Sequence, residues 1–198
     1  KNHPFTGLMD CFVAYSSVTV VYDPFLIKNR EKLPATVYDW VERQLYEAVQ
    51  YATLLEAPAR TPVSIPVCYE EAMAPDLLAL SRQTRLSPEE IIAVHTAGRY
   101  KVYMLGFLPG FAYMGVVDES ISVPRKTQPV RTAAGSVGIA GNQTGIYPLD
   151  SPGGWQIIGR TPLQLFDPGK QEFSLLRTGD EVKFYAISKD EFYQLKKN

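Results

Sequence analysis

One long segment of this sequence, Gly135–Gly159, combines residue types that suit the binding of a small polar ligand. It holds seven of the 14 glycines, and between Thr132 and Gly159 the only charged residue is Asp150. Glycine permits positive φ angles and lets backbone N–H groups approach another molecule closely. The glycines alternate with neutral hydrogen-bonding side chains and rings: Ser136, Asn142, Gln143, Thr144, Tyr147, Ser151, Trp155 and Gln156. This pattern favours a groove for an amide- or ureide-like ligand, although the tight turns of a barrel would also use these glycines.

A second block, Gly106–Gly115, places aromatic rings on a loop. It contains Phe107, Phe111 and Tyr113 together with three glycines and a proline. Rings held on such a loop can form the wall of a groove, where aromatic side chains contribute much of the binding energy. Burial in an ordinary core is the alternative for each ring. An apolar loop of this kind also predicts contact with a partner protein.

The common catalytic motifs are missing from the sequence. No G-x-x-x-x-G-K-[ST] loop is present, and Gly135–Gly138 does not match the G-x-S-x-G nucleophile motif. His3 and His95 are too few for a multi-histidine zinc site, so no metal is expected. His95 is interpreted as a structural residue in the last turn of a helix, where the helix dipole would favour its protonated form.

Four basic residues flank the neutral segment: Arg125, Lys126, Arg131 and Arg160. A guanidinium can bind a carboxylate or phosphate through two parallel hydrogen bonds. One of these residues is therefore a candidate anchor for an anionic ligand. The alternative is that each is an ordinary solvated surface group.

The composition excludes several classes of protein. The 198 residues include 20 basic and 21 acidic side chains, and a net charge of −1 gives no basic field for nucleic acid or a membrane surface. A hydrophobic content of 45% is typical of a folded globular chain. Cys11 and Cys68 are interpreted as small core residues, with a single disulfide as the minor alternative. No apolar run reaches the roughly 18–20 residues that span a bilayer, and without a visible signal peptide the default location is the cytoplasm.

The first sixty residues are predicted to form two strands and a helix. Residues 11–15 and 18–22 are rich in β-branched and aromatic side chains, which favours strands. From about 35 to 52 the apolar residues follow a helical stripe. Two strands and one helix make a thin core. Residues 57–62, with two prolines, are the predicted linker.

Beyond the linker, the sequence predicts a mainly β unit with two early helices. Residues 63–68 form a strand that Pro66 is expected to place at a sheet edge. Ser87, Pro88 and Glu90 together predict a capping box and hence a helix start. Short apolar pieces between Gly and Pro indicate a closed barrel or a sandwich. The other predicted elements are helices over 76–84, 87–96 and 190–195 and strands over 100–105 and 182–187.

Three blocks of the sequence resemble a known family: Gly106–Phe111, Ala134–Pro148 and Ser151–Pro162. They are similar to the B subunit of bacterial 5-oxoprolinase, whose family is also called KipI (the sporulation histidine-kinase inhibitor) or the first component of allophanate hydrolase. The family is in turn similar to one half of the carboxyltransferase domain of urea carboxylase. The resemblance covers essentially the whole chain, because Pro4–Leu8 and Val20–Pro24 fit the first domain of the family.

The resemblance implies an α+β, mainly β fold with two domains. A partial ferredoxin-like domain over residues 1–60 would precede a cyclophilin-like β-barrel domain over residues 61–198. Family members usually carry a few dozen residues before the position of Pro4, with a first strand and helix that are missing here. Thr132–Ala134 also replaces a Val-Pro-Ala of the family, which is expected to loosen one turn without abolishing the groove.

The resemblance also implies a function. The chain would be one component of a heteromeric, ATP-dependent 5-oxoprolinase, which opens the lactam of 5-oxo-L-proline to give L-glutamate. ATP would act at the level of the complex, and the partners would be a KipA-like protein and a LamB/YcsF-like protein. Inhibition of a histidine kinase and processing of allophanate stay open as alternatives. No biotin-carrying segment is present, so the chain is not a complete carboxylase.

The predicted binding site has walls, neutral hydrogen-bonding groups and anionic anchors. The walls are Phe107, Pro109, Phe111 and Tyr113. The neutral groups are Gln143, Thr144 and Tyr147, and the anchors are Arg125 and Arg160. No residue is assigned as a general base, and the chain alone is expected to be inactive.

Overall fold

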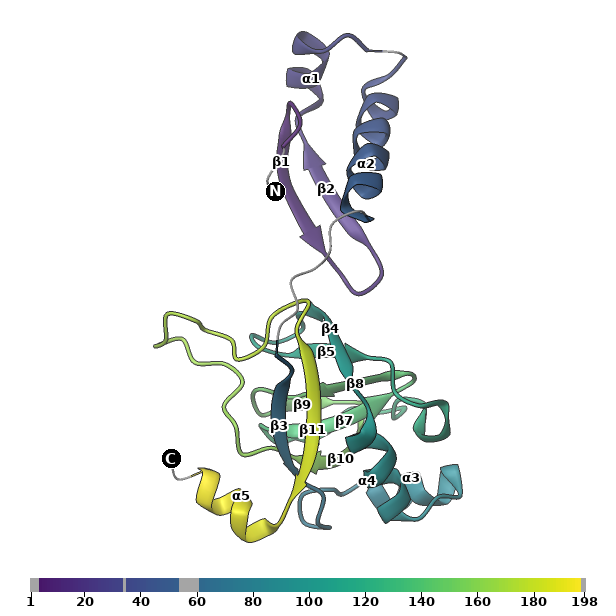
Figure 1. Cartoon of the computed structure of the whole chain (residues 1–198), viewed down its shortest axis with the longest axis vertical. Coiled ribbons are helices and arrows are strands. Elements are labelled where there is room, and N and C mark those ends of the chain that lie inside the picture. The colour runs from purple at the N-terminus through teal and green to yellow at the C-terminus, as the bar shows by residue number, and fades with distance from the viewer. Residues whose placement is uncertain (1–3, 34, 54–60, 197–198) are drawn as a thin grey trace. The chain divides into compact units, whose positions relative to one another are not determined.

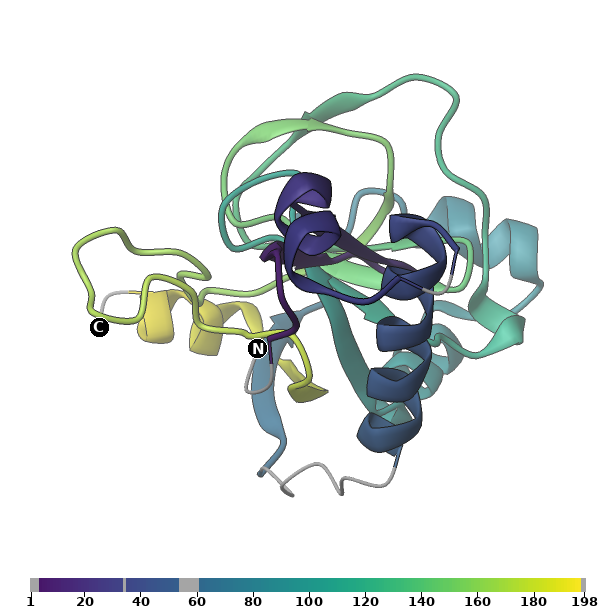
Figure 2. The same ribbon diagram turned by 90° about the horizontal axis from the view of Figure 1, so that it is seen from above.

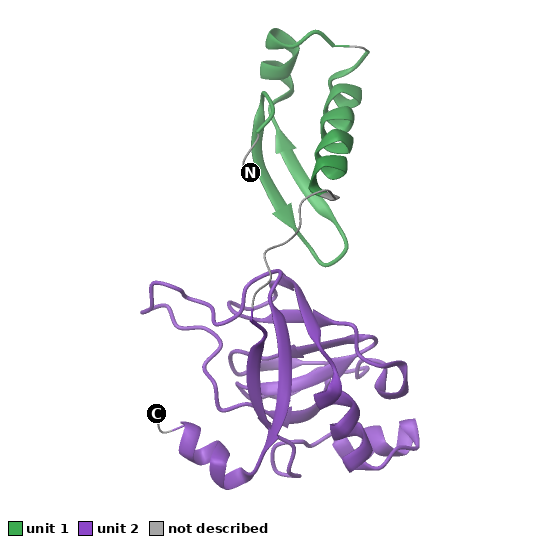
Figure 3. Cartoon of the chain, in the orientation of Figure 1, with its two compact units in different colours: residues 1–59 green, residues 60–198 purple. Residues whose placement is uncertain are grey.

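The computed structural model of the chain describes residues 4–33, 35–53 and 61–196. The chain divides into two compact units, residues 1–59 and 60–198 (Figure 3). The predicted linker at 57–62 falls largely outside the described residues. That residues 1–60 and 61–198 are independent domains stays a prediction.

The first unit is an antiparallel hairpin with two helices (Figure 1). Its elements are β1 (Leu8–Val13), β2 (Val18–Tyr22), α1 (Pro24–Arg30) and α2 (Val37–Thr53). The first strand begins at Leu8 rather than at Cys11 and ends before Tyr15. α1 was not predicted, although its start signal is in the sequence. The Asp23 carboxylate accepts hydrogen bonds from the backbone N–H groups of Phe25 and Leu26, and Pro24 lies in the first turn.

The core of this unit is thin, as predicted. Ile27 and Val41 are its buried hydrophobic residues among those described. Only part of the predicted stripe of α2 is covered, since Val49 is 59% exposed. Cys11 is only partly buried, so the interpretation of this cysteine as a core residue was wrong, whereas Cys68 is fully buried. Both cysteines are free thiols.

The second unit is built around a closed barrel of seven strands in the order β10-β3-β11-β4-β5-β8-β7 (Figure 1). The strands are β3 (Val63–Cys68), β4 (Tyr100–Leu105), β5 (Ala112–Gly115), β7 (Ser136–Ala140), β8 (Gln143–Ile146), β10 (Gln156–Arg160) and β11 (Glu181–Ile187). Two short strands, β6 (Val130–Thr132) and β9 (Ser151–Gly153), pair as a separate ribbon within the green arcs of Figure 2. The predicted fold class, an α+β chain with a cyclophilin-like barrel, is confirmed.

Three helices and a short 3₁₀ turn accompany the barrel: α3 (Leu77–Thr84), α4 (Pro88–Ala97), α5 (Lys189–Lys196) and the turn Glu119–Ile121. The predicted capping box of α4 is confirmed. The Ser87 N–H donates to Glu90 Oε2 at 2.7 Å, and the Glu90 N–H donates to Ser87 Oγ at 3.2 Å. α4 buries Ile91 and His95 and contacts β11, so it is fixed against the barrel wall.

β3 is not an edge strand, contrary to the prediction. It pairs in parallel with β11 along its whole length, but with β10 only where Cys68 meets Arg160. Pro66 therefore has a continuous strand neighbour on one side only. Because the pairing of β3 with β10 is limited to one residue pair, a residue without an N–H can stand in β3 without breaking a continuous ladder on that side. Proline is therefore compatible with a strand inside the barrel.

Candidate functional site

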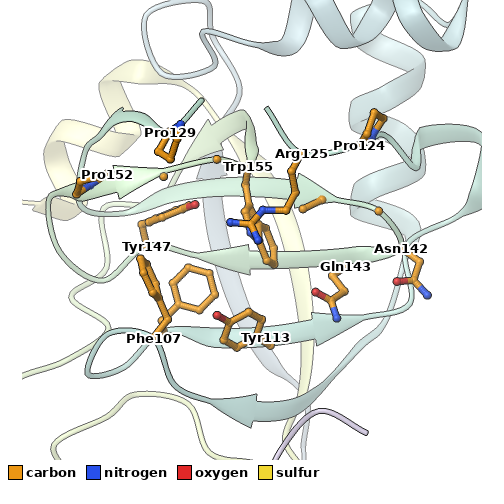
Figure 4. Close-up of a pocket in the computed structure, with 15 residues that line it drawn as sticks. Phe107, Tyr113, Pro124, Arg125, Pro129, Asn142, Gln143, Tyr147, Pro152 and Trp155 are labelled. Carbon is orange, nitrogen blue, oxygen red and sulfur yellow. The ribbon is translucent and has the colours of Figure 1, made fainter. Parts of the chain in front are cut away.

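A pocket of about 610 Å³ lies on the second unit, and it unites the two blocks that stand out in the sequence (Figure 4). Its lining residues are Phe107, Phe111, Tyr113, Pro124, Arg125, Pro129, Ala140, Gly141, Asn142, Gln143, Tyr147, Pro152, Gly153, Gly154 and Trp155. The barrel strands β5, β7 and β8 and the loops around them supply most of these residues. Pro124, Arg125 and Pro129, which lie between the two blocks in the sequence, add a further wall.

Phe111 is the centre of an aromatic cluster that forms the base of the pocket. Its ring centroid lies 4.7 Å from Tyr113, 5.1 Å from Tyr147, 5.5 Å from Trp155 and 5.6 Å from Phe107. Three of these contacts are edge-to-face, an arrangement that rings prefer to a face-to-face sandwich. Phe111, Tyr147 and Trp155 are buried, while Phe107 is 62% exposed. The base is therefore a packed apolar surface with one exposed ring beside it.

The exposed ring sits on an unusual backbone. Phe107 has a φ of 69°, in the left-handed region that bulky side chains rarely adopt. Two backbone hydrogen bonds close its loop, from Gly106 N–H to the Phe111 carbonyl at 3.1 Å and from Phe111 N–H to the Leu108 carbonyl at 3.0 Å. Backbone strain of this kind gathers at functional sites and persists because the surrounding structure holds it.

The glycines of Gly135–Gly159 serve both turns and close packing. Gly135 and Gly141 have φ angles of +83° and +59°, which suit glycine in turns. Gly138 and Gly145 face each other across β7 and β8, and a Cβ built on either would lie 3.0 Å from the Trp155 side chain. The absence of side chains at these two positions lets Trp155 pack directly on the barrel. The segment therefore forms tight turns and also one wall of the pocket.

The polar side-chain groups of the pocket are one guanidinium, two carboxamides, two phenols and one indole N–H, from Arg125, Asn142, Gln143, Tyr113, Tyr147 and Trp155. Burial raises the pKa of both Tyr113 and Tyr147 above the ordinary value of 10.0, against the opposing effect of the Arg125 charge. Both phenols are therefore neutral at pH 7 and can donate or accept hydrogen bonds. This set of groups suits the recognition of a small ligand with one negative charge and an amide.

Arg125 is the one charged side chain in the lining, within the described part of the chain. In Figure 4 its guanidinium points from the rim toward Trp155. Among the described residues it has neither a hydrogen-bond partner nor an ion-pair partner. The other flanking basic residues are engaged: Lys126 with Asp76 at 2.6 Å, Arg131 with Asp150 at 3.6 Å, and Arg160 Nε with the Ala134 carbonyl at 2.7 Å.

The structure brings most of the predicted site residues together and separates three from them. Phe107, Phe111, Tyr113, Arg125, Gln143 and Tyr147 all line the pocket. Pro109, Thr144 and Arg160 lie outside the lining. Pro109 is exposed on the turn after Phe107. Because Arg160 is bound to the Ala134 carbonyl, the role of anionic anchor passes to Arg125 as a proposal.

Thr144 points into the barrel instead of into the pocket. Its hydroxyl oxygen lies 3.1 Å from His95 Nε2 and 3.1 Å from the Gly138 carbonyl oxygen, and the residue is fully buried. Neighbouring side chains of a strand point to opposite faces. Since Gln143 lines the pocket, the next residue of β8 faces the interior.

His95 is a neutral, buried residue of the barrel interior. Its ring stacks on Phe184 with centroids 4.6 Å apart, and the Tyr69 hydroxyl lies 2.8 Å from Nδ1. Burial lowers the pKa of His95 to about 3, so the expectation of a protonated histidine was wrong. The cost of removing a charge from water outweighs the helix dipole here. The geometry agrees with the interpretation of His95 as a structural residue.

Several residues of the pocket were missed from the sequence. Pro124, Pro129 and Pro152 contribute to the lining, and so do Asn142 and Trp155, which the composition of the glycine-rich segment had marked only as possible ligand groups. For Pro124, the sequence offered one signal, which is its position next to a candidate anchor. Pro124 directly precedes the candidate anchor Arg125, and its ring fixes its own φ just before that anchor.

Membrane-spanning helices and metal clusters are both absent from the described residues. None of the helices over residues 4–33, 35–53 and 61–196 combines the length and the apolar character needed to cross a bilayer. Over those same ranges, no three His, Cys, Asp or Glu side chains lie close enough together to hold a metal ion.

Comparison with solved structures supports the architecture. A conserved uncharacterized protein from Pyrococcus horikoshii, PH0987, matches with a TM-score of 0.64 at 41% identity, covering 94% of this chain and 82% of that chain. The crystal structure of TTHA0988 matches with a TM-score of 0.72 at 34% identity over 94% of this chain. In that comparison this chain spans only 34% of the longer protein.

Comparison of sequences identifies the family. Residues 1–176 match the model of the carboxyltransferase domain, subdomain C and D. The chain is 43% identical to the B subunit of 5-oxoprolinase from Bacillus subtilis (strain 168) over 198 residues, which covers 99% of this chain and 82% of that protein. The chain therefore belongs to the carboxyltransferase subdomain C and D family, among the relatives of the 5-oxoprolinase B subunit.

Proposed function

We propose that this chain is one component of a heteromeric, ATP-dependent 5-oxoprolinase and that its pocket binds 5-oxo-L-proline. The names of its curated relatives support the assignment. The observation that carries the pocket assignment is the unpartnered guanidinium of Arg125 beside neutral phenols and carboxamides. The proposed substrate has one carboxylate and one lactam amide, which are the two groups that such a pocket recognises.

Each part of the ligand has a complement in the lining. Arg125 would bind the carboxylate, through a pair of charge-assisted hydrogen bonds. Gln143 and the Tyr113 and Tyr147 hydroxyls would bind the lactam carbonyl and N–H, because amides and neutral phenols can both donate and accept. The methylene groups of the ring would rest against Trp155.

Chemistry on the lactam would be completed by partner proteins. An unactivated lactam opens slowly, and coupling to ATP would activate its carbonyl by phosphorylation. The lining offers one guanidinium to a polyphosphate, which is a poor fit to ATP, so we place ATP binding in the complex and assign no step of it to this pocket. The proposed partners are a KipA-like protein and a LamB/YcsF-like protein, the other two components of the complex.

The test is ATP-dependent release of glutamate from 5-oxo-L-proline with all three proteins present and each omitted in turn. We expect activity only with the complete set, and the chain alone should be inactive. Release of glutamate that is the same with and without this chain would overturn the proposal. Inhibition of a purified histidine kinase by the chain, with no contribution to glutamate release, would favour the KipI-type alternative instead.

A further inference from the structure

Asp76 begins α3, yet its carboxylate does not cap that helix. It occupies the N-cap position without making a side-chain hydrogen bond to the first turn. Asp76 Oδ2 instead accepts from Lys126 Nζ at 2.6 Å and from the Ile157 N–H at 2.6 Å. The Asp76 N–H also donates to the Ile157 carbonyl at 3.0 Å. An N-cap hydrogen bond normally stabilises the start of a helix, so the Asp76 carboxylate contacts distant residues in place of its own helix.

The Asp76–Lys126 ion pair is removed from solvent. The two side chains are 17% and 18% exposed, whereas those of the Arg99–Glu181 pair are 65% and 41% exposed. Burying two charges costs desolvation free energy that their attraction offsets only when the geometry is good. Stability alone is therefore a weak reason for the pair, and its position in the fold suggests another.

The ion pair is one of three polar contacts made by the residues on either side of Arg125. The Lys126 N–H donates to the Gly154 carbonyl at 2.7 Å, and Gln156 Nε2 donates to the Pro124 carbonyl at 3.1 Å. Together with the Lys126–Asp76 bond, these contacts hold the residues on both sides of Arg125 to Gly154, to the first residue of β10 and to the start of α3.

The Arg125 side chain itself makes no hydrogen bond or ion pair among the described residues. Its guanidinium lies close to the Gly154 backbone, since a Cβ built on Gly154 would be 3.5 Å from Arg125 Nη2. An arginine side chain with an unbonded head group has many rotamers to choose from. The direction in which it leaves the rim is then set by its backbone and by the residues on either side.

We propose that Asp76 and Lys126 are positioning residues of the ligand pocket. Their ion pair holds the 124–126 segment so that the Arg125 guanidinium faces the pocket and is ready to bind a carboxylate. Neither residue lines the pocket, so both act through Arg125. This inference rests on the proposed function for the identity of the ligand, but not for the positioning itself.

The binding test is a double-mutant cycle on the full chain with 5-oxo-L-proline in titration calorimetry. Asp76→Asn should weaken binding roughly tenfold in the wild-type background and should have no further effect in an Arg125→Met background. Lys126→Met should behave like Asp76→Asn. Glu181→Gln, which breaks the exposed Arg99–Glu181 ion pair outside the pocket lining, is the control and should leave the dissociation constant unchanged. An equal loss of affinity in both backgrounds, or no loss in either, overturns the proposal.

A second readout separates this proposal from the proposed function. Nuclear magnetic resonance of the Arg125 Nε–H group reports how restricted the side chain is without any ligand. Asp76→Asn should lower its order parameter, and Glu181→Gln should not. If 5-oxo-L-proline binds no variant, including the wild type, the pocket assignment fails while this measurement still decides the positioning role. An unchanged order parameter in Asp76→Asn would overturn that role even if binding is weakened.

Discussion

The His95 imidazole is joined to the Thr144 hydroxyl inside the barrel, with 3.1 Å between Nε2 and Oγ1. The donors and acceptors around this contact form a complete chain. The Tyr69 hydroxyl donates to Nδ1, the Nε2–H group donates to Thr144, and the Thr144 hydroxyl donates to the Gly138 carbonyl. Burial keeps the imidazole neutral, and because the Thr144 hydroxyl donates to Gly138, the proton of the ring is placed on Nε2. It links α4 to the strands beneath the pocket.

Thr144→Val should destabilise the fold without a specific effect on ligand affinity. Valine has a similar shape but leaves the buried His95 N–H without an acceptor, which costs roughly 1–3 kcal/mol of unfolding free energy. Urea unfolding measures the loss, and Thr178→Val on an exposed loop is the control, with an expected change below about 0.5 kcal/mol. A large fall in affinity for 5-oxo-L-proline at unchanged stability would instead restore Thr144 to the binding site.

The stability of the protein should fall as the pH is lowered through the ordinary pKa of histidine. The pKa of His95 is about 3 in the folded chain, against 6.5 when histidine is exposed. The unfolded chain therefore binds the extra proton first, and the stabilisation that is complete above pH 6.5 is lost as the pH falls toward 3. Between about pH 7.5 and pH 5 the loss due to His95 should be about 2 kcal/mol.

The control for this pH dependence is His95→Gln, measured by urea unfolding at the same two pH values. The variant should be less stable at neutral pH but should lose markedly less stability on acidification. Carboxylates with lowered pKa values, such as that of Glu90, titrate mainly below this window. Equal acid sensitivity in both proteins would show that His95 does not stay neutral.

Arg125→Met should weaken the binding of 5-oxo-L-proline roughly tenfold, because a charge-assisted bond is lost at an exposed rim. Arg125→Lys should recover only part of this affinity, since an ammonium cannot form the paired hydrogen bonds of a guanidinium. Arg160→Ala is the matched comparison. It should change affinity by less than about twofold and lower stability by about 1 kcal/mol, because the Ala134 carbonyl loses its partner. A larger loss of affinity in Arg160→Ala than in Arg125→Met would show that Arg160 is the anchor.

Gly145→Ala should distort the base of the pocket. The added Cβ would lie 2.9 Å from the Ala112 carbonyl oxygen and 3.0 Å from the Trp155 ring, and the backbone of β5 cannot move away without breaking the barrel ladder. We expect a loss of roughly 1–3 kcal/mol and a shift in tryptophan fluorescence. Gly106→Ala is the control, because its nearest neighbour is the flexible end of Met104 at 3.4 Å. Similar losses in both variants would mean that Gly145 has no special packing role.

Residues 61–198 should fold without the first unit. The main hydrophobic cluster of the barrel is drawn entirely from this part of the chain, and each barrel strand pairs with two neighbours from the same unit. Expressed alone, it should unfold in one cooperative transition that near-ultraviolet circular dichroism and tryptophan fluorescence both follow. A broad, non-cooperative transition would show that the barrel depends on the first unit.

Local patterns determined much of the fold and some of the site. The Ser87 and Glu90 capping box, the strand at Tyr100–Leu105 and the turn glycines were readable because each depends on a few neighbouring residues. The aromatic loop and the neutral glycine-rich segment stood out by composition, and both line the pocket. An N-cap aspartate followed by proline, at Asp23 and Pro24, also marks the start of α1, although this helix was not predicted.

Only the tertiary structure decided which of these residues face one another. Gln143 and Thr144 are adjacent and both polar, but the pleat of β8 sends one to the pocket and the other to His95. Closure of the barrel made β3 an interior strand despite Pro66, and burial overcame the helix dipole at His95. Arg125 and Arg160 both flank the neutral segment, and the sequence does not distinguish them. In the structure, Arg160 donates to the Ala134 carbonyl, whereas Arg125 has no hydrogen-bond partner among the described residues. Such outcomes depend on contacts between residues far apart in the chain, which no local pattern encodes.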